Sequence, residues 1–177
     1  MTLPIDQQVL PHIISPTQSA FVPGRLIIDN VLVAYETLHT MHARKKGKKG
    51  TLALKLDISK AYDSVEWQFL QRIMEKMGFP ALWIERVMSC VTTPSFSILV
   101  NGKPYGTVQP SHGIHQGDPL PPHLFLLSAE GFTALLAKAE LEGRINGVSI
   151  CRGAPRVTNL LFVDDSLLFC QAIQNEG

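Results

Sequence analysis

Two adjacent aspartates in the sequence could support metal-dependent chemistry. Asp164 and Asp165 lie between two apolar segments, residues 160–163 and 167–169. Neighbouring carboxylates repel each other when both are ionised, and a bound cation removes that conflict. Mg²⁺ prefers hard oxygen ligands and is commonly held by one or two carboxylates together with water and substrate phosphates. The pair therefore predicts a divalent-metal site, and the alternative use of each acid is turn formation.

Asp57 could complete this site from a distant part of the chain. It follows the short apolar segment 51–56, which has β character, and a helical pattern opens near Ser59. If this strand neighbours the strands around Asp164, three carboxylates converge, which is the ligand set of a two-metal phosphoryl-transfer site. The alternative for Asp57 is a helix cap.

Hydrophobic periodicity predicts the elements that must position these acids. Helical spacing predicts helices over residues 29–41, 65–77, 82–91 and 124–139. In the second of these, we expect Val65, Phe69, Ile73 and Met77 to form a stripe that faces the core.

Two hairpins are predicted from the turn chemistry between apolar strands. Asn101-Gly102 tolerates positive φ at both turn positions, which predicts a hairpin of residues 96–100 and 105–108. The apolar segments on either side of Asp164 and Asp165 predict the second hairpin. The order of helices and strands predicts an α+β fold, with helices packed on one face of an antiparallel sheet.

Composition excludes several classes of protein. The chain has 177 residues, of which 45% are apolar and 18% charged, as expected of a folded domain rather than a disordered chain. No apolar stretch reaches the roughly 18 residues of a membrane-spanning helix, and no signal-peptide pattern is present. Cys90, Cys151 and Cys170 are widely spaced, which predicts reduced core cysteines. We therefore expect an intracellular protein, in the nucleus or the cytoplasm, that makes no membrane contact.

The net charge of +1 gives no general reason to expect a polyanionic partner. Positive charge is nevertheless concentrated in one short segment, which contains Arg44, Lys45, Lys46, Lys48 and Lys49. Such a segment is either a solvated turn or a weak contact for nucleic-acid phosphates.

Four blocks in collinear order resemble the reverse transcriptases of non-LTR retrotransposons, the LINE type, and most of all their plant members. Residues 54–67, LKLDISKAYDSVEW, resemble the first catalytic motif, and residues 162–165, FVDD, resemble the second. Residues 18–25, QSAFVPGR, followed by Asp29 and Asn30, resemble the fingers motif. Residues 113–120, GIHQGDPL, resemble the nucleotide-pocket motif.

The resemblance implies a partial right-hand polymerase, an RNA-directed DNA polymerase. Residues 1–50 would belong to the fingers, and residues 51–177 mostly to the palm, without a thumb. By matched position, Asp57, Asp164 and Asp165 would be catalytic and would hold two Mg²⁺ ions, for which Mn²⁺ is a possible substitute. The implied partners are an RNA template, a DNA primer and deoxynucleoside triphosphates.

The same resemblance implies four residues of a nucleotide site. Arg25 would clamp the triphosphate, and Tyr62 would crowd a ribose 2′-hydroxyl and so favour deoxynucleotides. Gln116 and Gly117 would line the nucleotide, since glycine allows close backbone approach. The alternatives are a surface arginine in a turn for Arg25 and a core aromatic for Tyr62. Glu130, on the helix that follows, is expected to be solvated.

The chain departs from the family pattern at three positions. His115 stands where arginine is usual, Pro121 where serine is usual, and Val163 where alanine is common, although valine suits a strand. The thumb has no counterpart, so we expect the isolated chain to be inactive. One alternative is a non-catalytic relic derived from a pseudogene, or a nucleic-acid-binding remnant. A metal-dependent nuclease would also use the three acids, but would leave Arg25, Tyr62 and Gln116 unexplained.

Overall fold

The structure is a computed structural model that describes residues 8–44, 50–115 and 120–171. The contacts between residues divide the chain into two compact units. The first contains residues 60–128, and the second contains the described residues before 60 and after 128.

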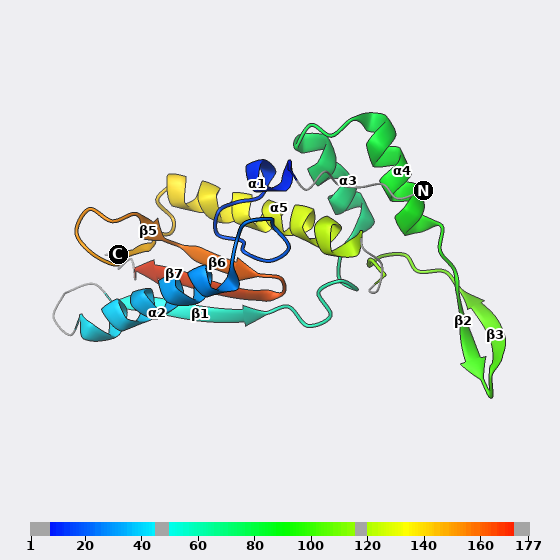
Figure 1. Ribbon diagram of the computed structural model, residues 1–177, viewed down its shortest axis with the longest axis horizontal. Helices are drawn as coiled ribbons and strands as arrows, with labels where there is room; N and C mark the ends of the chain where they lie inside the picture. The colour runs from blue at the N-terminus through cyan, green and yellow to red at the C-terminus, as the bar shows by residue number, and fades with distance from the viewer. Residues whose placement is uncertain (1–7, 45–49, 116–119, 172–177) are drawn as a thin grey trace, which may run out of the picture. The chain divides into compact units, whose positions relative to one another are not determined.

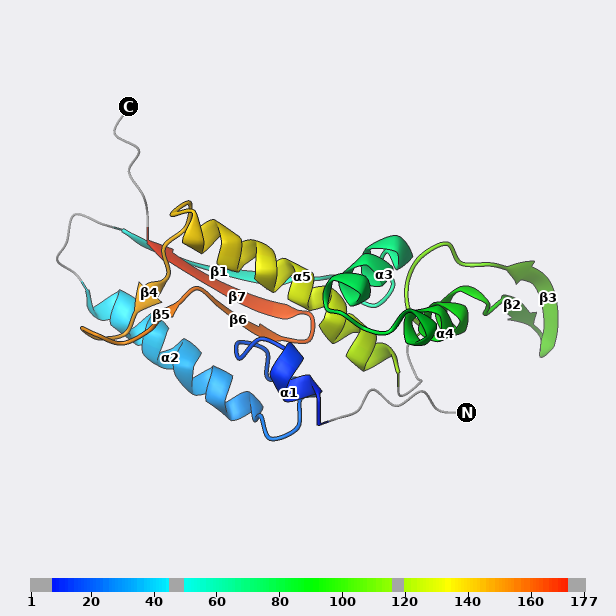
Figure 2. The ribbon, with the colours of Figure 1, turned by 90° about the horizontal axis from the view of Figure 1, so that it is seen from above.

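The second unit is built on a three-stranded antiparallel sheet. Its strands are β1 (Thr51–Asp57), β7 (Asp165–Gln171) and β6 (Asn159–Phe162), and β7 lies in the middle (Figure 2). β1 and β7 pair along their whole length, from Thr51 opposite Gln171 to Asp57 opposite Asp165. The predicted strand before Asp57 and the predicted hairpin around Asp164 are therefore both confirmed.

Helix α2 (Ile27–Ala43) lies beside β6 and β4 (Figure 2). Its Ala34 packs with Phe169 of β7 and Leu160 of β6, and all three side chains are buried. Since apolar burial is the main stabilising term, this contact fixes the helix against the sheet. The predicted helix over 29–41 is confirmed, with about one further turn in total at its two ends.

Three short elements of the second unit had no counterpart in the sequence patterns. They are α1 (Leu10–Ile13), β4 (Val148–Ser149) and β5 (Arg156–Val157). Elements of two to four residues are too short to show a hydrophobic period, which is why the periodicity missed them.

The first unit contains two helices and an isolated hairpin. The helices α3 (Trp67–Lys76) and α4 (Ala81–Thr92) pack together. The hairpin strands are β2 (Phe96–Val100) and β3 (Lys103–Val108), joined by Asn101 and Gly102 (Figure 1). Both turn residues have positive φ, 51° and 77°, as the dipeptide predicted. Every residue of β2 and β3 is exposed.

The predicted core stripe was right at Val65, which is buried, but wrong along α3 itself. Leu70 and Met74 are fully buried, whereas Phe69 is 43% exposed. A period of four matches either set, and the packing of α3 against α4 decides which of them faces inward. The cysteines were also placed wrongly, because Cys90 and Cys151 are exposed and Cys170 is only partly covered.

The long helix α5 (Pro121–Leu141) runs through the boundary between the units and confirms the helix predicted over 124–139. The helices and antiparallel sheets together confirm the α+β class.

Candidate active site

The structure brings Asp57 and Asp165 together at one end of the sheet, and Asp164 precedes Asp165 in the turn between β6 and β7. Asp57 ends β1, Asp165 begins β7, and the two are register partners. Paired residues of antiparallel strands project from the same face, so the two carboxylates share a face of the sheet. The backbone N–H of Ile58 donates a hydrogen bond to the carbonyl oxygen of Asp164 at 3.3 Å, which ties the turn to the end of β1.

Lys55 supplies a cation to this group of acids. Its Nζ lies 2.8 Å from Oδ1 of Asp165. The hydrogen bond and the charge of Asp165 raise the pKa of the Lys55 ammonium above its usual value, and the charges of Asp57 and Asp164 add to the effect. Sequence reasoning missed this residue. The available signal was its position two residues before Asp57, which places both side chains on one face of a strand.

The arrangement of these acids determines which of them could hold a divalent ion. Within the described ranges, no group of three or more His, Cys, Asp or Glu side chains is placed so that it could hold a metal. Asp57 and Asp165 nevertheless share a face, and an ammonium already lies against Asp165. Two carboxylates completed by water and substrate oxygens satisfy Mg²⁺. The donor set therefore fits an ion held by these two residues, and participation of the Asp164 side chain stays a prediction.

The turn between β6 and β7 carries backbone strain at Val163. Its φ is 52°, in the left-handed region that a β-branched side chain rarely adopts. The expectation that valine suits a strand at this position was wrong, because the residue lies in the turn itself. Strain of this kind is typical of functional sites.

Two segments of the first unit meet at Gly113. The backbone N–H of Gly113 donates to the carbonyl of Val65 at 2.8 Å, and its carbonyl accepts from Nε1 of Trp67 at 2.6 Å. The backbone N–H of Ile114 donates to the carbonyl of Tyr62 at 2.9 Å. The start of the 113–120 block is thus bonded directly to the segment that follows Asp57.

Two features of the structure favour glycine at position 113. Its φ is +86°, and a Cβ there would lie 3.0 Å from the carbonyl oxygen of Asp63.

Tyr62, predicted to line a nucleotide, is half-buried and stacks on Phe125 of α5, with 5.2 Å between the ring centroids. The contact with Phe125 fits the core-aromatic alternative, and contact with a sugar stays a prediction.

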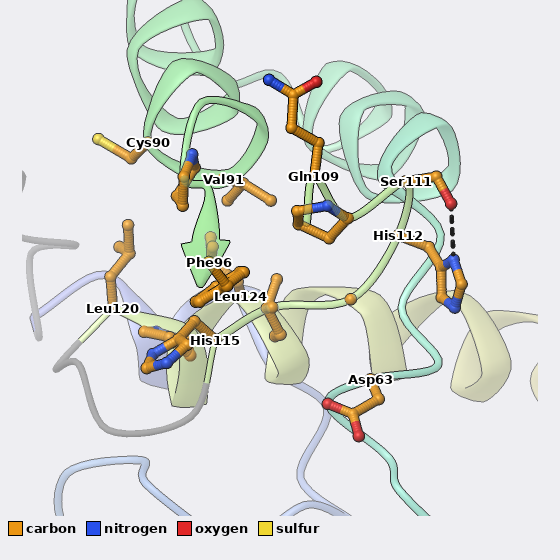
Figure 3. A pocket seen from close by; sticks show the side chains of 15 residues that line it. Asp63, Cys90, Val91, Phe96, Gln109, Ser111, His112, His115, Leu120 and Leu124 are labelled. Atoms are coloured by element: carbon orange, nitrogen blue, oxygen red, sulfur yellow. Dashed lines mark hydrogen bonds between the residues drawn. The ribbon is translucent and has the colours of Figure 1, made fainter. Parts of the chain in front are cut away.

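A cavity of about 580 Å³ lies beside Gly113 within the first unit (Figure 3). Phe96 and His115 line it and stack on each other, with 5.3 Å between their centroids. His115 therefore has an aromatic partner in the structure. Gln116 and Gly117, the predicted nucleotide contacts, lie outside the described residues.

The guanidinium of Arg25 is hydrogen-bonded to main-chain oxygens of the second unit. Its two Nη atoms donate to four carbonyls, which belong to Pro11, Ile14, Ser15 and Gln18. These bonds hold the segment between α1 and α2 in shape. The predicted triphosphate clamp would need the same donors, so a structural role accounts for the observed geometry and the clamp stays a prediction.

Glu130 of α5 is a partner in the same region. Its Oε1 accepts a hydrogen bond from the backbone N–H of Ser15 at 3.0 Å. Burial raises the pKa of this carboxyl, and the Ser15 hydrogen bond and the charge of Arg25 oppose the rise. The expected solvated glutamate was wrong, because the carboxylate is partly buried against the Ser15 segment.

Of the predicted basic segment, the structure describes Arg44 alone. Its Nη2 donates to the carbonyl of Ser149 at 2.6 Å. Lys45, Lys46, Lys48 and Lys49 lie outside the described residues, so the contact with nucleic acid stays a prediction.

Among the helices of the described ranges, none is long and apolar enough to cross a membrane.

Comparison with known proteins identifies related sequences. Residues 2–176 match the family of reverse transcriptases (RNA-dependent DNA polymerases). An uncharacterised 149 kDa protein of transposon TX1 from Xenopus laevis is 30% identical over 93% of this chain. The Pol polyprotein of the retrotransposable element R2 from Popillia japonica is 33% identical over 71% of it. An uncharacterised mitochondrial protein of Arabidopsis thaliana is 44% identical over 38% of it.

The matched regions are only parts of these relatives. They cover 12% of the TX1 protein, 20% of the R2 polyprotein and 56% of the Arabidopsis protein.

Proposed function

Since this chain belongs to the reverse transcriptase (RNA-dependent DNA polymerase) family, we propose that it serves RNA-directed DNA synthesis in a LINE-type retrotransposon protein. The family match over residues 2–176 favours this reading over a nuclease. The proposed partners are an RNA template, a DNA primer and deoxynucleoside triphosphates. In this assignment the sheet of β1, β7 and β6 belongs to the palm, and α2 and the segment before it belong to the fingers.

The observation that carries the proposal is the register of Asp57 opposite Asp165. Reverse transcriptases generally use divalent metal ions, and these two carboxylates would hold them, joined by Asp164 across the turn. Bound ions would lower the pKa of the primer 3′-hydroxyl and stabilise the charge of the leaving pyrophosphate. The task of the chain is then to hold the acids in place.

Two backbone features perform that task. The β1–β7 ladder fixes Asp57 and Asp165 on one face, and the Ile58–Asp164 hydrogen bond holds the turn against β1. Accurate placement matters in such a site, since a shift of about 1 Å in the reacting groups can cost on the order of a hundredfold in rate.

The test is RNA-templated primer extension by a chimera. This chain would replace the matching segment of the Popillia R2 polyprotein, so that the rest of the longer protein is present. We expect extension that disappears in the Asp57→Asn and Asp165→Asn variants. The matched control is Glu142→Gln, which removes an exposed, ion-paired carboxylate from the same unit. Extension that survives both aspartate variants would refute the proposed site.

A further inference from the structure

We propose that Lys55 is an internal counter-ion of the acid site, which competes with a divalent ion for Asp165 and so sets the affinity of the site for metal. This inference rests on the proposed function, because it assumes that Asp57 and Asp165 hold the ion. No comparison assigns a role to Lys55. Lys55 lies on β1, two residues before Asp57.

Strand alternation and the β1–β7 register place Lys55 close to the acids. Side chains two residues apart on a strand share a face, so Lys55 and Asp57 project together from β1. The register partner of Asp57 is Asp165, which places the Asp165 carboxylate diagonally across from Lys55. Diagonal neighbours are within reach of a long side chain. The observed Nζ–Oδ1 distance of 2.8 Å is that of a charge-assisted hydrogen bond.

The ammonium occupies one of the two carboxylate oxygens that Asp165 can offer to a metal. An ion held by Asp57 and Asp165 would need carboxylate oxygens of both residues, and Oδ1, one of the two oxygens of Asp165, is already bonded to Nζ. Without an ion, Lys55 offsets part of the repulsion between the paired carboxylates. With an ion, the ammonium has to leave Oδ1 or bind less closely, because it is repelled by the metal charge.

The Lys55–Asp165 ion pair is exposed, so a metal ion can displace the ammonium from the carboxylate. The side chains of Lys55 and Asp165 are 63% and 50% exposed. Exposed ion pairs contribute little to stability, because water screens their attraction. A doubly charged ion that also contacts Asp57 can therefore displace the ammonium, at the expense of part of its own affinity.

The first experiment measures Mn²⁺ binding to the 177-residue chain, with free Mn²⁺ followed by electron paramagnetic resonance. Lys55→Met removes the charge and keeps an unbranched side chain, whereas Lys55→Arg keeps the charge. Lys138→Met is the matched control, because Lys138 is an exposed lysine of the same unit that pairs with Glu142.

Removal of one positive charge about 4 Å from the site should tighten Mn²⁺ binding about fivefold in Lys55→Met. Lys55→Arg and Lys138→Met should bind as the wild type does. Unchanged or weaker binding by Lys55→Met, with binding still lost in Asp165→Asn, would overturn this inference and leave the proposed metal site intact. Mn²⁺ binding that is absent, or indifferent to Asp57→Asn and Asp165→Asn, would overturn both.

A second measurement reports on the ion pair without any activity. A double-mutant cycle of Lys55→Met and Asp165→Asn gives the coupling between the two side chains from urea unfolding. We expect a favourable coupling in metal-free buffer that disappears in saturating Mn²⁺. A coupling of zero without metal, or one that Mn²⁺ leaves unchanged, would show that Lys55 does not compete with the ion.

Discussion

Asp57 and Asp165 form the last register pair of the β1–β7 ladder, so two like charges face each other across adjacent strands. Like charges at directly opposed positions destabilise a sheet. The arrangement therefore has a structural cost that a bound cation would relieve. The opposed carboxylates should therefore lower the stability of the metal-free chain while they favour binding of a metal ion.

Asp57→Asn should make the metal-free chain slightly more stable, by up to about 0.5 kcal/mol, because it removes the repulsion between opposed carboxylates. The same change should abolish the rise in melting temperature that Mg²⁺ produces in the wild type by binding the folded state. Thermal unfolding with and without Mg²⁺ measures both effects. Glu142→Gln should keep the Mg²⁺-dependent rise. A rise of equal size in Asp57→Asn would contradict an ion site at this residue.

Val163→Ala should stabilise the chain by about 1 kcal/mol, because alanine lacks the branched Cβ that makes a φ of 52° costly. Equilibrium unfolding in urea measures the change. Val157 provides the comparison, since it is an extended strand residue packed against the core of the second unit, and its change to alanine should destabilise the chain. Equal losses at the two positions would show that Val163 is not strained.

Glu130 should make the stability of the chain depend on pH above the ordinary glutamate pKa. Because burial raises the pKa of this carboxyl, the folded state holds its proton to higher pH than the unfolded state does. The contribution of Glu130 to stability therefore falls as pH rises from the unfolded pKa through the folded one. Glu130→Gln should remove this fall and keep an acceptor for the Ser15 N–H.

Glu130→Ala should cost about 1 to 3 kcal/mol at every pH, because the Ser15 N–H would lose its partner. Urea unfolding at a series of pH values compares the three proteins. An identical pH dependence of wild type and Glu130→Gln would rule out a perturbed carboxyl at this position.

Gly113→Ala should destabilise the first unit by more than about 1 kcal/mol, because a Cβ would add crowding against Asp63 to an unfavourable φ. Gly78→Ala is the matched control. It also has a positive φ, of +81°, but its Cβ would meet no atom within 4 Å. The difference between the two losses in urea unfolding measures the crowding alone. Equal losses would mean that the contact with Asp63 is relaxed at no cost.

Tyr62→Val, in the chimera with the R2 polyprotein, should raise the use of ribonucleotides relative to deoxynucleotides, because it removes the proposed gate at the sugar. Single-nucleotide incorporation kinetics give the ratio of the two kcat/KM values. Tyr62→Phe keeps the ring that stacks on Phe125 and should keep the wild-type ratio. A ratio that is the same in all three proteins would leave Tyr62 with its packing role alone.

The sequence by itself determined the features that depend on neighbouring residues. Helical spacing located α2, α3, α4 and α5, the apolar segment 51–56 indicated β1, and Asn101-Gly102 determined the turn between β2 and β3. These succeed because helical spacing, strand alternation and turn conformation are local properties of the chain. The collinear motifs likewise indicated the family, which the match over residues 2–176 confirms.

Tertiary structure decided what each side chain meets. The burial of Leu70 rather than Phe69, the carbonyl partners of Arg25 and the left-handed conformation of Val163 all depend on how separate segments pack. Lys55 shows the reason most directly. Its place on the same face as Asp57 follows from strand alternation, but its partner Asp165 is supplied by the β1–β7 register, which hydrogen bonding between distant segments sets.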